Sequence, residues 1–288
     1  MSEIKSETNN IFQREDRKFS MQDTSLTKKI EAFSYYQEPF LRFNCNKRLQ
    51  DTNIKLLDNF VSKFIGEITG KSNLSLQKDI HEFMAYIGTN PALSYQGVTS
   101  HGSLLWLFLI ARCLQPKTLV ESGIYRGSSL HCFRQAIPQA NIFAFDLNLK
   151  PLLVKDSSIK IWEKDWSEVE ICAESENDLC YFDDHINNGL RIRQAFERGF
   201  KNLIFDDAPF LGTVHKFKYP GVPTVPMILN CEEGDVLQWC HANQCLQYSF
   251  REKDAYGAKD LIEFAQPIPA HQEFTSRMVG VQYFVKLK

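Results

Sequence analysis

The chain has 288 residues, a formal net charge of −2 at pH 7, and 43% hydrophobic and 24% charged residues. A chain of this length and composition can fold as a globular protein with a sizeable hydrophobic core. A charge so close to neutral, without a long block of Lys and Arg, argues against a nucleic-acid partner. The longest apolar run, Leu104 to Ala111, is far too short to cross a bilayer, so we expect no membrane partner.

Eight cysteines are scattered along the chain, and none belongs to a C-x-x-C pair of the kind that binds zinc or performs redox chemistry. Residues 1–28 contain no apolar stretch of signal-peptide length. We therefore expect reduced thiols and a cytoplasmic location.

The first third of the chain is predicted to be a tail followed by helices. Residues 1–28 are rich in Ser, Asn, Gln, Lys and Glu, a composition that favours disorder. Residues 29–97 form a predicted N-terminal helical cap, because apolar side chains recur at helical spacing from Ile54 to Phe64 and from Ile80 to Ile87. A homodimer formed through these helices is a further expectation.

Residues 98–288 are predicted to form the main domain. A nearly all-apolar helix over Ser103 to Leu114, ended by Pro116, leads into alternating strands and helices, with helices expected at Ser128 to Ile137 and Gly189 to Arg198. The strand candidates are Thr118 to Val120, Asn141 to Phe145, Ile159 to Trp162, Leu179 to Phe182, Asn202 to Phe205, Cys245 to Phe250 and Val281 to Leu287. This alternation predicts an α/β fold, a doubly wound, mostly parallel, seven-stranded Rossmann-like sheet whose last two candidates pair as an antiparallel edge.

The segment from Thr118 to Asp146 has the pattern of one β-turn-α-β unit in which an acid closes each strand. Glu121 closes the first strand and Asp146 the second. Gly123 and Gly127 allow close backbone approach in the turn, and the helix that follows offers its N-terminus to an anionic group. Asp146 comes about twenty residues on, where nucleotide-binding sheets hold the ribose hydroxyls. The unit therefore predicts a nucleoside site.

The motif Glu121-x-Gly123-x-x-x-Gly127 differs from the G-x-G-x-x-G of dinucleotide-binding dehydrogenases. It resembles the first motif of class I methyltransferases, whose cofactor is S-adenosylmethionine. Tyr125 and Ser129 extend the likeness to Glu-x-Gly-x-Tyr-x-Gly-x-Ser, a form that recurs in catechol O-methyltransferase-like enzymes and in sugar and macrolide O-methyltransferases. Carboxylates suit this cofactor because they accept hydrogen bonds from ribose hydroxyls and complement the sulfonium charge.

The resemblance also implies which groups bind the cofactor. It implies that Ser129 contacts the methionine carboxylate, that Asp146 contacts the ribose hydroxyls, and that Asp165 and Trp166 contact the adenine. Two plainer interpretations stay open. The glycines can mark only a tight connection between strand and helix, and Asp165 and Trp166 can belong to an ordinary surface loop.

Two neighbouring strands are predicted to end in paired acids. Asp183 and Asp184 follow one strand candidate, and Asp206 and Asp207 follow the next. Like charges gathered at strand ends need a cation or hydrogen-bond donors to offset their repulsion. Hard carboxylate oxygens suit Mg²⁺. The pattern therefore predicts a divalent-metal site.

The O-methyltransferase resemblance implies the same site. Its Asp-His after the fourth strand is similar to Asp184-His185, and its Asp-Asn after the fifth strand is similar to Asp206-Asp207, so Asp184, Asp206 and Asp207 are the predicted metal ligands. Two alternatives stay open. A register shifted by one residue pairs Asp207 with Ala208 and removes one ligand, and the acids can instead cap two helices without a metal.

The general base is left open by the resemblance, because Asn187 stands where the catechol enzymes carry a lysine. His185 is our candidate, since an imidazole titrates near neutral pH and can accept a hydroxyl proton; His215 is the second candidate. The predicted reaction is Mg²⁺-assisted methyl transfer from S-adenosylmethionine to a hydroxyl of a small molecule, such as a sugar, polyketide or other natural product. An NAD-dependent oxidoreductase or epimerase, and a non-catalytic nucleoside-binding protein, are the competing readings.

Overall fold

The computed structural model describes residues 47–95, 99–206, 208, 221–241, 244–269 and 282–288. All of them belong to the unit formed by residues 36–288. The predicted tail over residues 1–28 lies outside the described residues, as do Asp207 and His215.

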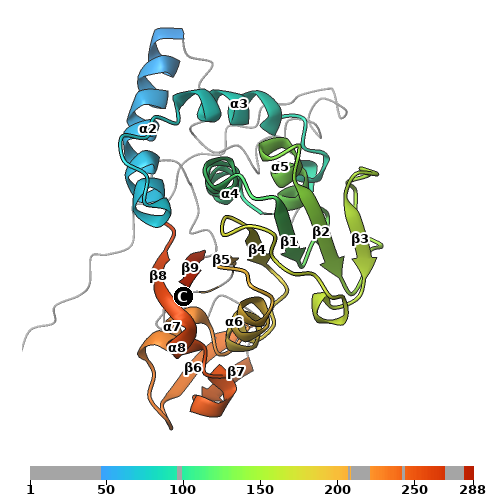
Figure 1. Cartoon of the computed structure of the whole chain (residues 1–288), viewed down its shortest axis with the longest axis vertical. Helices are drawn as coiled ribbons and strands as arrows, with labels where there is room; N and C mark the ends of the chain where they lie inside the picture. Colours follow the sequence, from blue (N-terminus) through green and yellow to red (C-terminus); the bar gives the residue numbers. More distant parts are fainter. Residues whose placement is uncertain (1–46, 96–98, 207, 209–220, 242–243, 270–281) are drawn as a thin grey trace, which may run out of the picture. The chain divides into compact units, whose positions relative to one another are not determined.

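A seven-stranded sheet forms the centre of the fold, in the order β3-β2-β1-β4-β5-β9-β8 (Figure 1). Its first five strands are parallel, whereas β9 runs antiparallel to both β5 and β8. The strands are β1 (Thr118–Ser122), β2 (Asn141–Asp146), β3 (Lys160–Glu163), β4 (Leu179–Phe182), β5 (Asn202–Phe205), β8 (Ile262–Pro267) and β9 (Tyr283–Leu287). The predicted α/β fold with a mostly parallel, seven-stranded sheet is therefore confirmed.

The prediction for the antiparallel edge was wrong in one strand. The candidate Cys245 to Phe250 corresponds to β7 (Gln244–Ser249), which pairs only with β6 (Val236–His241) in a separate two-stranded sheet. The seventh strand of the main sheet is β8, which pairs with β9. Strand β8 was missed because it is a partly exposed edge strand with polar residues and a terminal proline, and such strands lack a continuous apolar run.

Helices cover both faces of the main sheet (Figure 1). On one side lie α4 (His101–Leu114) and α5 (Ser128–Ala136), with α2 (Lys47–Thr69) and α3 (Gln77–Ile87) packed beyond them; on the other lie α6 (Asn188–Glu197), α7 (Val225–Asn230) and α8 (Ala258–Leu261). Helix α4 begins where the Ser100 hydroxyl accepts a hydrogen bond from the Ser103 N–H (3.2 Å). It ends at Gln115, whose φ of +51° is left-handed.

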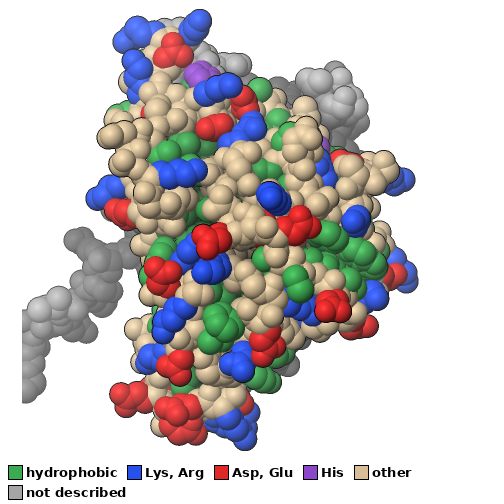
Figure 2. Space-filling view, in the orientation of Figure 1, with side chains coloured by type: hydrophobic (Ala, Val, Ile, Leu, Met, Phe, Trp, Pro, Cys, Tyr) green, Lys and Arg blue, Asp and Glu red, His purple; other side chains and the backbone are tan. Residues whose placement is uncertain are grey.

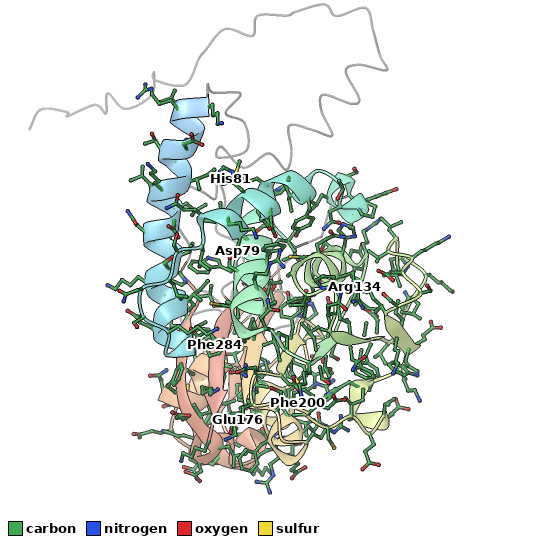
Figure 3. The ribbon with its side chains drawn as sticks, turned by 45° about the horizontal axis from the view of Figure 1, so that its top comes forward. Asp79, His81, Arg134, Glu176, Phe200 and Phe284 are labelled. Atoms are coloured by element: carbon green, nitrogen blue, oxygen red, sulfur yellow. The ribbon has the colours of Figure 1, made fainter. Side chains whose placement is uncertain are left out.

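Successive residues of the strands point into two separate cores. Leu119 and Tyr181 belong to the core under α2, α3, α4 and α5, whereas Val120 belongs to the core under α6, α7 and α8. Phe284 and Phe200 belong to the first and second core respectively (Figure 3). Because the helices of the predicted cap share a core with one face of the sheet, the domain boundary at residue 97 stays a prediction from sequence alone.

Charged side chains of both signs are mixed on the surface, as expected for a chain with a net charge of −2. On the face drawn in Figure 2, basic and acidic side chains are interspersed. None of the helices in the described ranges combines the length and apolar content needed to cross a membrane. The described cysteines with free thiols are Cys113, Cys132, Cys172, Cys180 and Cys231.

Candidate functional site

The ends of four strands meet at the carboxyl edge of the parallel sheet. Backbone hydrogen bonds continue beyond the strands, from the Gly123 N–H to the Phe145 carbonyl (2.8 Å), from the Asp183 N–H to the Ser122 carbonyl (2.8 Å), and from the Asp206 N–H to the Phe182 carbonyl (2.9 Å). The acids in the last residues of β1 and β2, and those that follow β4 and β5, therefore lie along one edge, where open α/β sheets bind their ligands.

Gly123 is the point at which the turn after β1 touches the end of β4. Its φ is +92°, and a Cβ at this position would lie 2.3 Å from the Asp183 carbonyl oxygen and 2.7 Å from the Asp184 nitrogen. No side chain fits this contact, so glycine is required here for space as well as for backbone conformation. The close approach holds the turn against the segment that carries Asp184.

Asp146, at the end of β2, organises the same turn. Its Oδ2 accepts hydrogen bonds from the N–H groups of Ile124 (3.0 Å) and Tyr125 (2.8 Å), and its Oδ1 accepts one from Asn148 (2.9 Å). These bonds hold Tyr125 at a φ of +43°, a conformation rarely adopted by residues other than glycine. Each carboxylate oxygen can accept two hydrogen bonds, so Oδ1 keeps capacity for a ligand hydroxyl.

Glu121 lies beneath the turn and is fully buried. The Ser129 hydroxyl donates a hydrogen bond to its Oε1, whereas Oε2 has no partner among the described residues. Burial raises the pKa of Glu121 to about 8, against the opposing effect of the Ser129 hydroxyl. A buried acceptor without a donor is costly in a folded protein, so Oε2 suits a donor group of a ligand.

Gly127 allows a loop to pack closely against the start of α5. Its φ is +85°, and a Cβ there would lie 2.7 Å from Val154 Cγ2 and 2.9 Å from Leu152 Cδ1. The two glycines of the motif therefore have different tasks. Gly123 brings β1 against β4, and Gly127 lets the loop over residues 152–154 pack on the helix start.

Arg191, on α6, is a central residue of the site that the sequence interpretation missed. Its side chain is 1% exposed and pairs with two acids, Asp184 (Nη2 to Oδ2, 2.8 Å) and Asp165 (Nη1 to Oδ1, 3.1 Å). It also donates to the Gln194 side chain (2.9 Å). One signal was available: Arg191 lies on the same face of the helix as the buried residues Asn188 and Ala195, and a buried arginine requires acidic partners.

The loop after β3 holds Asp165 and Trp166, the predicted adenine contacts. Burial opposes ionisation of Asp165, but hydrogen bonds from Arg191 and Ser167 outweigh it and lower its pKa to about 2. Trp166 is fully buried in the second core, and its indole N–H donates to the Gln194 side chain (3.1 Å). In this conformation Trp166 offers no exposed ring face, so a contact between this loop and a ligand falls to Asp165 and the backbone.

The acids predicted to bind a metal are held by donors of the protein. Asp184 pairs with Arg191, and Asp206 Oδ2 accepts hydrogen bonds from the Tyr181 hydroxyl (2.7 Å) and the Gln282 side chain (2.9 Å). Within the described ranges, no group of three Asp, Glu, His or Cys side chains is placed to hold an ion. Asp207, the third predicted ligand, lies outside those ranges.

His185 is exposed and has a φ of +56°, a left-handed conformation of the kind that is enriched at functional sites. The other base candidate, His215, lies outside the described residues. Asn187, which stands where the resemblance expects a lysine, caps α6: its Oδ1 accepts a hydrogen bond from the Leu190 N–H (3.1 Å) and its Nδ2 donates to the Asp254 carbonyl (2.9 Å). This position is therefore structural in the chain.

No protein-family model and no curated protein matches the sequence. Among solved structures, the chain is similar to the O-methyltransferase from Bacillus cereus in complex with SAH (11% identity, covering 82% of this chain and 100% of that one, TM-score 0.42). It is also similar to the methyltransferase PaMTH1 from Podospora anserina bound to SAH (13% identity, 85% and 98% covered, TM-score 0.40).

A third similar structure is CmcI with Mg and SAM (16% identity, covering 66% of this chain and 75% of CmcI, TM-score 0.39). In a second CmcI structure, with SAH, the match covers 39% of this chain and 65% of CmcI, with a TM-score of 0.34.

Proposed function

We propose that the chain is a class I S-adenosylmethionine-dependent O-methyltransferase that acts on a hydroxyl of a small molecule. The observation that carries the proposal is the pair of carboxylates around the Gly123 turn: Asp146, with acceptor capacity left, and Glu121, whose buried Oε2 has no partner among the described residues. Acids at this place suit a ligand with hydroxyl groups, an ammonium group and a sulfonium charge, and they oppose a pyrophosphate.

The competing oxidoreductase fits less well. Dinucleotide-binding sheets of the Rossmann type are built from two parallel βαβαβ halves and cradle a pyrophosphate on a G-x-G-x-x-G turn. Here β9 is antiparallel between β5 and β8, and the glycines of the turn lie four residues apart. A non-catalytic nucleoside-binding protein would share the same cofactor contacts, so only ligand binding and turnover separate it from the enzyme.

The residues of the chain have distinct tasks in this proposal. Asp146 accepts hydrogen bonds from the ribose hydroxyls, Glu121 accepts one from the amino group, and Asp165 with the backbone of its loop borders the adenine. The bound cofactor supplies an electrophilic methyl group. His185, exposed at the end of β4, accepts the proton of the acceptor hydroxyl, with His215 as the second candidate. Transfer of a methyl group needs mainly positioning, which the rigid strand ends provide.

Magnesium is the part of the sequence-based prediction that the described residues fit least. A cation at Asp184 would compete with the guanidinium of Arg191, which already neutralises that acid at 2.8 Å. Asp206 is held by two donors. Because the acids are engaged in this way, we assign the cation no step in the reaction, and a Mg²⁺ requirement stays a prediction for chelation experiments to decide.

Thermal unfolding with added ligands tests the proposal. A ligand present at about 100 times its Kd stabilises a protein by about 2.7 kcal/mol, which corresponds to a rise of about 5–10 °C in Tm for a domain of this size class. We expect this rise with S-adenosylhomocysteine and none with NAD⁺. A rise with NAD⁺ alone would favour the oxidoreductase. A rise with S-adenosylhomocysteine but no methylation of any hydroxyl compound would favour the non-catalytic protein.

A further inference from the structure

Arg126 lies inside the motif turn, between Gly123 and Gly127, and is flanked by two aromatic rings. Its guanidinium carbon is 4.5 Å from the centre of the Tyr95 ring and 5.1 Å from the centre of the Tyr125 ring. Both tyrosines are 44% exposed. The guanidinium is therefore held at the turn by two ring contacts, which involve none of its hydrogen-bond donors.

Arg126 also differs from the other partly buried arginines of the fold. Arg112 pairs with Asp79 and Glu82, and Arg134 pairs with Asp156. Within the described ranges, Arg126 pairs with no acid and donates no hydrogen bond, and its buried Nε has no acceptor. A cation with five donors and no acidic partner suits a planar anion such as a carboxylate, which it can bind through two parallel hydrogen bonds.

The Ser129 hydroxyl is already used within the protein and does not bind a ligand carboxylate in this conformation. The O-methyltransferase resemblance implies that Ser129 contacts the methionine carboxylate, yet its side chain is buried and its hydroxyl donates inward to Glu121. A serine hydroxyl has one proton to donate. The carboxylate at the amino-acid end of the cofactor therefore needs another donor, and Arg126 is the cation of this turn.

We propose that Arg126, held between Tyr95 and Tyr125, binds the carboxylate at the amino-acid end of the cofactor. This assignment rests on the proposed function. It gives the amino-acid end two partners: Oε2 of Glu121 accepts from the ammonium group, and the Arg126 guanidinium binds the carboxylate.

The test compares two ligands that differ only in this end. S-adenosylhomocysteine carries the amino-acid carboxylate, whereas 5′-methylthioadenosine keeps the adenosine and the thioether but lacks the amino-acid group. Binding of both is measured by isothermal titration calorimetry to the full chain, to Arg126→Gln, and to Arg126→Lys. Arg193→Gln is the matched control, because Arg193 is an exposed arginine that pairs with Glu197 on α6.

We expect Arg126→Gln to weaken the binding of S-adenosylhomocysteine by about ten- to a hundredfold, the loss typical of a charge-assisted hydrogen-bonded pair. The affinity for 5′-methylthioadenosine should be unchanged. Arg126→Lys restores part of the affinity, and Arg193→Gln binds both ligands like the unmodified chain. Equal S-adenosylhomocysteine affinity in Arg126→Gln and the unmodified chain would overturn the assignment, as would an equal loss for both ligands. If the unmodified chain bound neither ligand, the proposed function itself would fail.

Discussion

Replacing Arg191 by methionine removes the cation that holds two acids of the site, while keeping most of the apolar stem. The Arg191 side chain is 1% exposed, and its partners Asp184 and Asp165 are 12% and 27% exposed. Breaking a buried ion pair from one side costs about 3–5 kcal/mol, because the remaining charge stays buried without a partner. This is a large part of the about 5–15 kcal/mol that stabilises an ordinary domain.

Urea unfolding followed by circular dichroism measures this cost. We expect Arg191→Met to lose about 3–5 kcal/mol at pH 7, and the matched variant Arg193→Met, on the exposed side of α6, to lose less than about 1 kcal/mol. Adding Asp184→Asn and Asp165→Asn to Arg191→Met should recover part of the loss, since the uncompensated charges are then gone.

The pH dependence of this loss has a defined sign. With Arg191 present, the pKa of Asp165 is about 2 in the folded chain, so its stabilising effect is complete above its ordinary pKa of 3.8 and is lost as the pH falls through about 2. Without Arg191, Asp165 loses its main cationic partner and binds its proton at a higher pH, so the difference between the two chains should shrink as the pH falls from 7 to 4. A loss under about 1 kcal/mol at pH 7, or a pH-independent difference, would refute the reasoning.

Three further outcomes are expected. Gly123→Ala should cost on the order of 2 kcal/mol more in unfolding free energy than Gly234→Ala, because both glycines have φ near +90° but only Gly123 meets backbone, 2.3 Å away at Asp183; equal costs would contradict the contact. Burial raises the pKa of Glu121 from 4.5 to about 8 in the folded chain, so the unfolding free energy should fall as the pH rises between these values. Glu121→Gln should not show this fall, and parallel pH profiles of the two chains would contradict the prediction. Loss of methyl transfer in EDTA, restored by added Mg²⁺, would support the magnesium prediction; turnover unchanged by EDTA would agree with Arg191 as the cation that neutralises Asp184.

The parallel part of the sheet could be predicted because each of its strands is recognisable from its own short run of residues. Strands buried on both faces are mostly apolar along their length, and polar residues mark their carboxyl ends, as Glu121 and Asp146 do in the last residues of β1 and β2. Strand β8 could not be found this way, because an edge strand is only partly buried and its pairing with β9 depends on residues about twenty positions later.

The contacts of the site were harder to predict than its position. The motif places Ser129 at the helix start, but the direction of its hydroxyl depends on Glu121, which lies on another element. Arg191 becomes central only when α6 brings it between Asp184 and Asp165, and the latter comes from the loop after β3. The acids at the strand ends were predicted to need a cation or hydrogen-bond donors, and the cation beside Asp184 is the Arg191 side chain of the protein.

A crystal structure with S-adenosylhomocysteine would show where each end of the bound ligand lies. We expect the ribose hydroxyls within hydrogen-bond distance of Asp146 and the amino-acid end over the turn between Gly123 and Gly127. A ligand bound at the amino ends of the strands, or away from that turn, would contradict it.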